Sequence, residues 1–110
     1  MEFPSADLEK TKLFFSTVFS WEFQDYGPEY ICYENESLSG GFYLSDKSSV
    51  RENGAALLIF YSQSLKETQS KISDAGGTII KPIFEFPGGS RFHFTDTTGN
   101  EFAVWSDLDP

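Results

Sequence analysis

Basic residues and cysteines are scarce in this sequence. Eight Lys and Arg residues against seventeen Asp and Glu residues give a formal net charge of −9 and a pI near 4.4. This balance argues against nucleic acid and anionic membrane surfaces as partners, because both carry negative charge. The single cysteine, Cys32, excludes an internal disulfide framework, and its apolar, strand-like surroundings predict a buried, reduced thiol. No apolar run approaches membrane-spanning length, and no basic stretch followed by an apolar one marks the start, so we expect a soluble cytoplasmic protein.

Apolar and aromatic residues, by contrast, are plentiful for a chain of 110 residues. Hydrophobic residues make up 39% of the sequence and aromatic residues 17%, including twelve Phe. This supply is enough for the packed interior of one domain, or of two small modules that share a core. The acidic balance permits a cationic ligand, although a solvated acidic surface is the simpler explanation.

The stretch from Ser90 to Trp105 predicts a β-hairpin. Two runs rich in aromatic and branched residues, 90–95 and 101–105, flank a turn in which Gly99 supplies the positive φ that such loops need. Alternation then divides the side chains of the hairpin between two faces. The core face carries Phe92, Phe94, Phe102 and Val104, and the other, mixed face carries Arg91, His93, Glu101, Ala103 and Trp105. A mixed face of this kind is typical of a cavity wall or an interface.

Capping residues and helical spacing predict two helices. Asp7 is a suitable N-cap for a helix over residues 8–19. Ser64 and Glu67 form a capping box for a second helix over 65–75, which the pair Gly76-Gly77 ends. The polar segment 45–53 is the only plausible linker. Strand-like segments lie at 21–26, at 29–34, at 38–44 after a turn at 35–37, at 54–61 as a buried apolar strand, and at 78–83.

The two halves of the chain repeat one plan at an offset of 57 residues. Asp7 aligns with Ser64, both as helix caps, and Thr11 aligns with Thr68. Each half contains one strand, one helix and three further strands. Two helices and about eight strands indicate an α+β protein whose helices cover one face of the sheet. The uncovered faces then curve toward each other and enclose a central cleft.

Two segments resemble motifs of the vicinal oxygen chelate superfamily, also called the glyoxalase, bleomycin-resistance and extradiol-dioxygenase superfamily. The run from Asp7 to Trp21 is similar to the first-helix motif of that family, and the run from Phe94 to Asn100 is similar to its final turn, with Thr97 where a proline is usual. The resemblance implies a curved mixed sheet built from two βαβββ modules, with the helices on the outer face, and commonly a homodimer. It divides residues 1–110, as a single glyoxalase-like domain, into module one (1–44), the linker (45–53) and module two (54–106).

The same resemblance implies where a metal ion would bind. Metal enzymes of this family place one His or Glu ligand on each of four strands, since imidazole and carboxylate suit an open divalent site. The matching positions in this sequence are Ala103, Ala55 and a position near Gly41, while the first ligand would precede Glu2 by two residues, ahead of the first residue given. We therefore predict no metal at the usual site and no cofactor.

Five residues are predicted to bind a ligand on the concave side, and they are Glu2, Arg91, His93, Glu101 and Trp105. A lone histidine between two phenylalanines is usually a structural residue satisfied by a neighbouring acceptor, but His93 also suits a donor or a general base for a small ligand. Arg91 suits either bidentate binding of a carboxylate or phosphate, or a salt bridge with Glu101. No catalytic residue is assigned.

Three functions are compatible with these residues. The first is a metal-free protein of this family that binds a small molecule in the cleft, in the manner of its antibiotic-sequestering members. The second is a metal-dependent lyase, isomerase or dioxygenase with non-standard ligands such as Glu2, His93 and Glu101. The third is a non-catalytic interaction module whose cleft is closed.

Overall fold

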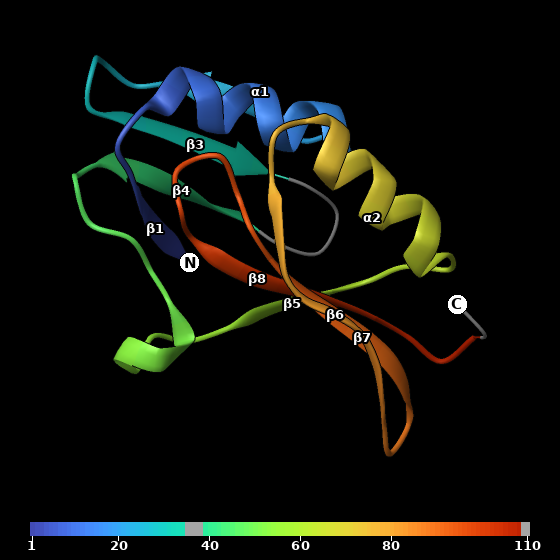
Figure 1. The fold of residues 1–110 in the computed structure, drawn as a ribbon. Coiled ribbons are helices and arrows are strands. Elements are labelled where there is room, and N and C mark those ends of the chain that lie inside the picture. The colour runs from blue at the N-terminus through green and yellow to red at the C-terminus, as the bar shows by residue number, and fades with distance from the viewer. Residues whose placement is uncertain (35–38, 109–110) are drawn as a thin grey trace.

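A computed structural model describes residues 1–34 and 39–108 of the chain (Figure 1). The predicted turn at 35–37 and the start of the third predicted strand, Leu38, lie outside the described residues. None of the helices in residues 1–34 and 39–108 combines the length and the apolar composition of a bilayer-spanning segment. The elements of the first half are β1 (Glu2–Ser5), α1 (Leu8–Phe19), β2 (Glu22–Asp25), β3 (Tyr30–Glu34) and β4 (Ser39–Leu44). Those of the second half are the short 3₁₀ helix η1 (Arg51–Asn53), β5 (Leu58–Tyr61), α2 (Leu65–Asp74), β6 (Thr78–Phe86), β7 (Gly89–Thr95) and β8 (Glu101–Ser106).

The strands form two open four-stranded sheets with the same internal order. The first sheet has the order β1-β4-β3-β2 and the second has the order β5-β8-β7-β6. In each, the first strand of the half pairs in parallel with the last, and the remaining pairs are antiparallel. The predicted α+β fold of two βαβββ modules is confirmed, with the strands divided between two sheets.

Both helices begin as the capping residues predict, and the repeat extends to individual hydrogen bonds. The Asp7 side chain accepts from the backbone N–H of Lys10, and Ser64 accepts from that of Glu67. The hydroxyl groups of Ser5 and Thr11 lie 2.7 Å apart, and those of Ser62 and Thr68 lie 2.7 Å apart in the second half. Each pair ties the end of a strand to the first turn of the following helix.

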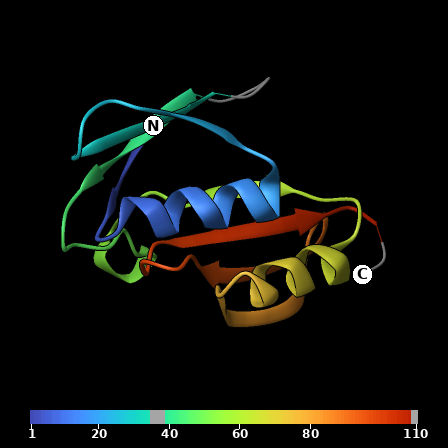
Figure 2. The ribbon, with the colours of Figure 1, turned by 90° about the horizontal axis from the view of Figure 1, so that it is seen from above.

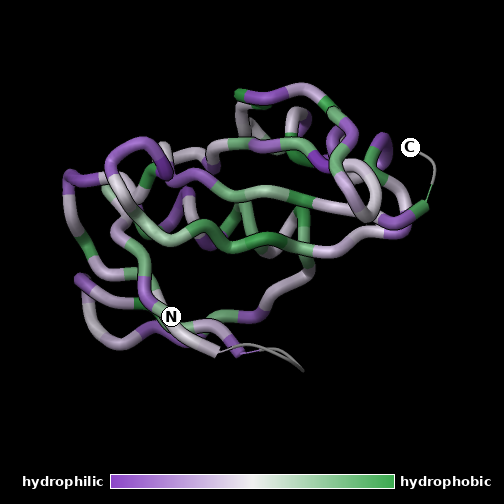
Figure 3. The backbone as a smooth tube through the Cα atoms, turned by 90° about the horizontal axis from the view of Figure 1, so that it is seen from below, coloured by the Kyte–Doolittle hydropathy of each residue, from purple (hydrophilic) through white to green (hydrophobic). Residues whose placement is uncertain are grey.

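Helix α1 packs against strands of both sheets, so the two halves share one core. The Phe15 ring lies 5.4 Å from Phe42 of β4 and 5.4 Å from Phe102 of β8, centroid to centroid. The Phe3 ring of β1 lies 5.1 Å from Phe102. Figure 2 shows α1 running along β8, and Figure 3 shows hydrophobic segments in the middle of the molecule. The predicted core residues are all buried, namely Phe14, Phe15, Ile72, Phe92, Phe94, Phe102 and Val104.

Asn100 connects three distant segments beneath the β7–β8 turn. Its side chain is 0% exposed. Its Nδ2 donates to the Pro4 carbonyl of β1 at 2.6 Å, and its Oδ1 accepts from the Ser49 backbone N–H at 2.8 Å. The Asn100 backbone N–H donates in turn to Asp96 Oδ1 at 3.0 Å. The hairpin turn therefore holds both the first strand and the segment before η1.

Three predictions of local structure are wrong. The apolar run 54–61 is not a buried strand, because β5 covers only its last four residues and lies at the edge of its sheet, where Ile59 and Tyr61 are 40% and 49% exposed. Cys32 is a free, half-buried cysteine, because it alternates with the buried Ile31 and points away from the core. The strand predicted to end at Ile83 continues to Phe86, with register shifts around Pro82, whose missing N–H cannot join the ladder.

Candidate functional site

The mixed face of the hairpin forms the centre of the candidate site. In the β7–β8 register, Arg91 lies opposite Trp105, His93 opposite Ala103, and Thr95 opposite Glu101. Phe92 and Phe94 are buried on the other side, where Phe94 packs against Phe14 of α1, so the predicted assignment of the two faces is confirmed. His93 is nevertheless 0% exposed, because neighbouring side chains on its own face cover it, among them Phe84 at 5.9 Å between ring centroids.

Arg91, His93 and Glu101 form a continuous hydrogen-bonded array. Arg91 donates from Nη2 and Nε to His93 Nε2 at 2.8 and 3.2 Å, and His93 Nδ1 lies 2.9 Å from Glu101 Oε2. Because arginine has only donors, Nε2 must be the acceptor, which assigns a neutral imidazole with its proton on Nδ1. His93 then donates to the Glu101 carboxylate. Arg91 and Glu101, for which a salt bridge was one of the two predictions, are instead connected through His93, which is hydrogen-bonded to both.

The electrostatic surroundings are consistent with this neutral imidazole. Burial lowers the pKa of His93, and the positive charges of Arg91 and Lys81 lower it further, against the opposing effect of Glu101. Burial raises the pKa of Glu101, but hydrogen bonds from His93 and from the Arg51 backbone N–H outweigh it and leave that pKa below its usual value. The Arg51 N–H donates to Glu101 Oε1 at 2.9 Å. Glu101 therefore stays ionised, and His93 neutral, near pH 7.

Aromatic rings from β6 enclose the Arg91 guanidinium. Its central carbon lies 5.7 Å from the centroid of Phe84 and 5.8 Å from that of Phe86, within the range of cation–π contacts. Phe86 lies 6.3 Å from Trp105 at an interplanar angle of 66°. The head of Arg91 is thus fixed between a hydrogen-bonded imidazole and aromatic walls.

A cavity of about 540 Å³ opens beside this arginine. Its volume falls within the range of small-molecule sites, which is on the order of 300–1,000 Å³. One wall of the cavity is β5 and β8, another is the β6–β7 turn, and the residues that line it are Ile59, Phe86, Pro87, Gly88, Arg91, Trp105 and Asp107. Most of these side chains are apolar, and we call this space the Arg91 cavity.

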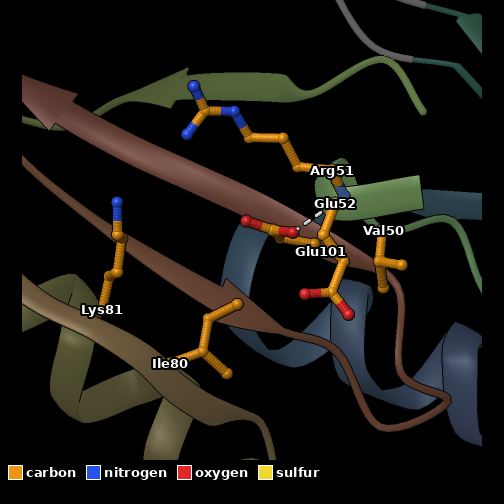
Figure 4. Close-up of a pocket in the computed structure, with 6 residues that line it drawn as sticks. All are labelled: Val50, Arg51, Glu52, Ile80, Lys81 and Glu101. Atoms are coloured by element: carbon orange, nitrogen blue, oxygen red, sulfur yellow. Dashed lines mark hydrogen bonds between the residues drawn. The ribbon is translucent and has the colours of Figure 1, made fainter. Parts of the chain in front are cut away.

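A second cavity, of about 500 Å³, lies at the opposite end of the array. Glu101 forms part of its wall, together with Arg51, Glu52, Lys81, Val50 and Ile80 (Figure 4). Figure 4 shows the side chains of Arg51 and Lys81 extending to the same side of Glu101, while Glu52 points away from them. His93 therefore joins two cavities, with Arg91 in one and Glu101 in the other.

The structure brings four of the five predicted ligand-binding residues to one face. Arg91, His93 and Glu101 are bonded in sequence, and Trp105 lines the Arg91 cavity. Glu2 lies on the other sheet, where its carboxylate accepts from the Tyr30 hydroxyl at 3.0 Å. The aromatic residues Phe84 and Phe86 were missed because the predicted strand stopped at Ile83. Their alternation up to the Pro87-Gly88 turn was the available signal.

The residues at the positions that the resemblance assigns to metal ligands do not fit a metal ion. Ala103 is buried opposite His93 and, like Ala55, carries only a methyl group. The space beside Gly41 that a side chain would need is occupied by the Tyr30 ring. Among the residues that the structure describes, no three His, Cys, Asp or Glu side chains are grouped so as to hold a metal ion. Both ring nitrogens of His93 are also engaged, by Glu101 and Arg91.

Comparisons with known proteins agree with this fold. The family model described as the glyoxalase/bleomycin resistance protein/dioxygenase superfamily matches residues 1–104. A search among curated proteins finds no match. A glyoxalase/bleomycin resistance protein/dioxygenase family enzyme from Burkholderia phytofirmans PsJN aligns with a TM-score of 0.83 and 17% identity, over 98% of this chain and 96% of that one.

Two further solved structures are similar at the level of the fold. The genomically encoded fosfomycin resistance protein of Listeria monocytogenes has a TM-score of 0.78 and 20% identity, over 96% of this chain and 88% of that one. Lactoylglutathione lyase from Agrobacterium tumefaciens has a TM-score of 0.72 and 16% identity, over 96% and 90% of the two chains.

Proposed function

Because the chain belongs to the glyoxalase/bleomycin resistance protein/dioxygenase superfamily, we propose that it binds a small organic molecule, without a metal ion at the positions that the family's enzymes use. The Arg91 cavity carries this proposal. Its apolar walls supply contact area, and the guanidinium supplies one oriented polar group, which is the usual composition of a small-molecule site. The fosfomycin resistance protein and lactoylglutathione lyase, by their names, also act on small molecules.

A thermal-shift screen of a small-molecule library, in buffer with a chelator and again with divalent metal, tests this function. At a free ligand concentration ten times Kd, mass action adds about 1.4 kcal/mol to the free energy of unfolding. A domain of this size then gains roughly 5–10 °C in Tm. We expect the compounds that bind to raise the Tm in the buffer that contains the chelator.

Two aromatic truncations locate the binding site. Trp105→Ala removes a wall of the Arg91 cavity and is expected to abolish the shift, whereas Tyr43→Ala removes an exposed aromatic side chain from the first sheet and is expected to preserve it. Stabilisation that requires divalent metal and disappears in His93→Gln would instead support a metal-dependent lyase, isomerase or dioxygenase. A library with no stabilising compound would refute ligand binding and favour an interaction module.

The proposal extends to the state of the protein in the cell. We propose a cytoplasmic homodimer, supported by the aromatic content of the chain and by the common assembly of this family. Residues 1–110 are proposed to act as one domain of two modules, joined by the linker at 45–53. This division is supported by the repeated element order of the two halves.

A further inference from the structure

We propose that the ligand of the Arg91 cavity is a hydrophobic carboxylate, whose carboxylate group binds Arg91 and whose apolar body contacts Trp105, Phe86 and Ile59. This inference rests on the function proposed above and specifies its ligand class. The Arg91 guanidinium, rather than the net charge of the chain, is the reason for proposing a ligand with a negatively charged group.

The hydrogen bonds of Arg91 to His93 use one edge of its guanidinium. His93 takes the edge formed by Nε and Nη2, and the rings of Phe84 and Phe86 lie near the guanidinium carbon. The remaining edge, with Nη1 and the second N–H of Nη2, is not used by His93. Two parallel N–H groups match the two oxygens of a carboxylate, and such bidentate pairs are the stronger kind of charge-assisted hydrogen bond.

The other charged residue that lines this cavity in the described chain is Asp107. Its Oδ1 accepts from the Tyr61 hydroxyl at 2.6 Å, so the carboxylate already has a neutral donor. Tyr61 in turn packs against Trp105 with 5.1 Å between ring centroids. The cavity thus contains one cation and one anion, and of these two the Arg91 guanidinium is the group that can bind a ligand carboxylate, while the apolar and aromatic wall contacts the body of the ligand.

The pKa of His93 reports on ligand binding at the neighbouring Arg91. His93 is the only histidine of the chain. Its imidazole is in contact with Arg91, Glu101 and Phe84, and the Lys81 charge also acts on it. The charge of Arg91 is one of the influences that lower the pKa of His93. A carboxylate that neutralises this charge is therefore expected to raise the pKa of His93, in the direction opposite to the effect of a bound cation.

Four probes with one phenylethyl body and different head groups test the ligand class by NMR titration of the native protein. They are 3-phenylpropionate, its neutral amide, 2-phenylethylamine and 2-phenylethylphosphonate. The expected result is tightest binding of the carboxylate, at least about tenfold tighter than the amide, since a hydrogen bond to a charged group contributes more than a neutral one. The His93 ring signals are expected to titrate at higher pH with the carboxylate bound.

Three substitutions test where the carboxylate probe binds. Arg91→Gln is expected to weaken binding of the carboxylate probe at least about tenfold and to change binding of the amide probe little. Lys66→Gln removes a positive charge from the exposed surface of α2 and is expected to change neither affinity. Arg51→Gln alters the cavity at the other end of the array, so a loss of binding in this variant, with Arg91→Gln unaffected, would move the site and overturn the inference.

The remaining outcomes also decide between ligand classes. Preference for the amine, the amide or the phosphonate over the carboxylate overturns the inference, and so does a panel in which no probe shifts the residues of the Arg91 cavity. The proposed function is then decided by the library screen alone, because that screen detects a ligand of any charge.

Discussion

Replacement of Asn100 by alanine is the most direct test of how the two halves are held together. The substitution removes the acceptor for the Ser49 N–H and the donor to the Pro4 carbonyl, and Pro4 is itself buried. A buried polar group left without a partner costs about 1–3 kcal/mol. The Pro4 carbonyl incurs this cost, and the half-buried Ser49 N–H, which water reaches more easily, incurs a smaller one. We expect a loss of about 2–4 kcal/mol in the free energy of unfolding.

Urea denaturation followed by circular dichroism measures this loss. Asn53→Ala is the matched control, because Asn53 is exposed in η1 and its truncation is expected to stay within about 0.5 kcal/mol of the parent protein. The slope of unfolding free energy against urea is expected to be unchanged, since the same surface is exposed on unfolding. A loss below about 0.5 kcal/mol for Asn100→Ala would refute the role assigned to this side chain.

Three other predictions concern the array, the metal and the assembly. The pKa of His93 is lower in the folded chain than its usual 6.5, so the unfolded chain binds more protons, and stability is complete above about pH 6.5 and decreases as the pH falls toward the folded pKa. His93→Gln is expected to remove this component from a series of urea denaturations between pH 5 and pH 7.5, and an unchanged pH dependence would contradict the neutral imidazole. Elemental analysis after dialysis against a chelator and then buffer is expected to find no stoichiometric metal; one equivalent per chain, lost in His93→Gln or Glu101→Gln, would reverse this prediction. Light scattering at micromolar concentration is expected to give twice the mass of one chain, and the mass of a single chain would argue decisively against the homodimer.

The sequence predicts those parts of the fold that depend on neighbouring residues. Asp7, Ser64 and Gly76 mark the ends of the two helices, because each acts within one turn of its own position. The two faces of the final hairpin also follow from alternation around a short turn. Local chemistry is sufficient in these segments, since their hydrogen-bonding partners are close in the chain.

The parts that sequence patterns miss depend on distant partners. The run 54–61 is uniformly apolar, but its exposure depends on its edge position beside β8. The contact of Glu101 with the Arg51 N–H spans 50 residues, and nothing in either segment indicates it. Phe84 and Phe86 contact Arg91 only because β6 shifts register near Pro82. The candidate site was therefore predictable as a polar face, but not as a hydrogen-bonded array beside an aromatic cavity.

The packing of Phe3 on Phe102 has a consequence for the synthesis of the chain. Strand β5 pairs with β8, and β1 and α1 bury their aromatic rings against the same late strand. During translation, the first half therefore leaves the ribosome with these rings lacking part of their final cover, and long-range pairing of this kind is slow. We expect the nascent chain to expose this apolar surface until β8 emerges.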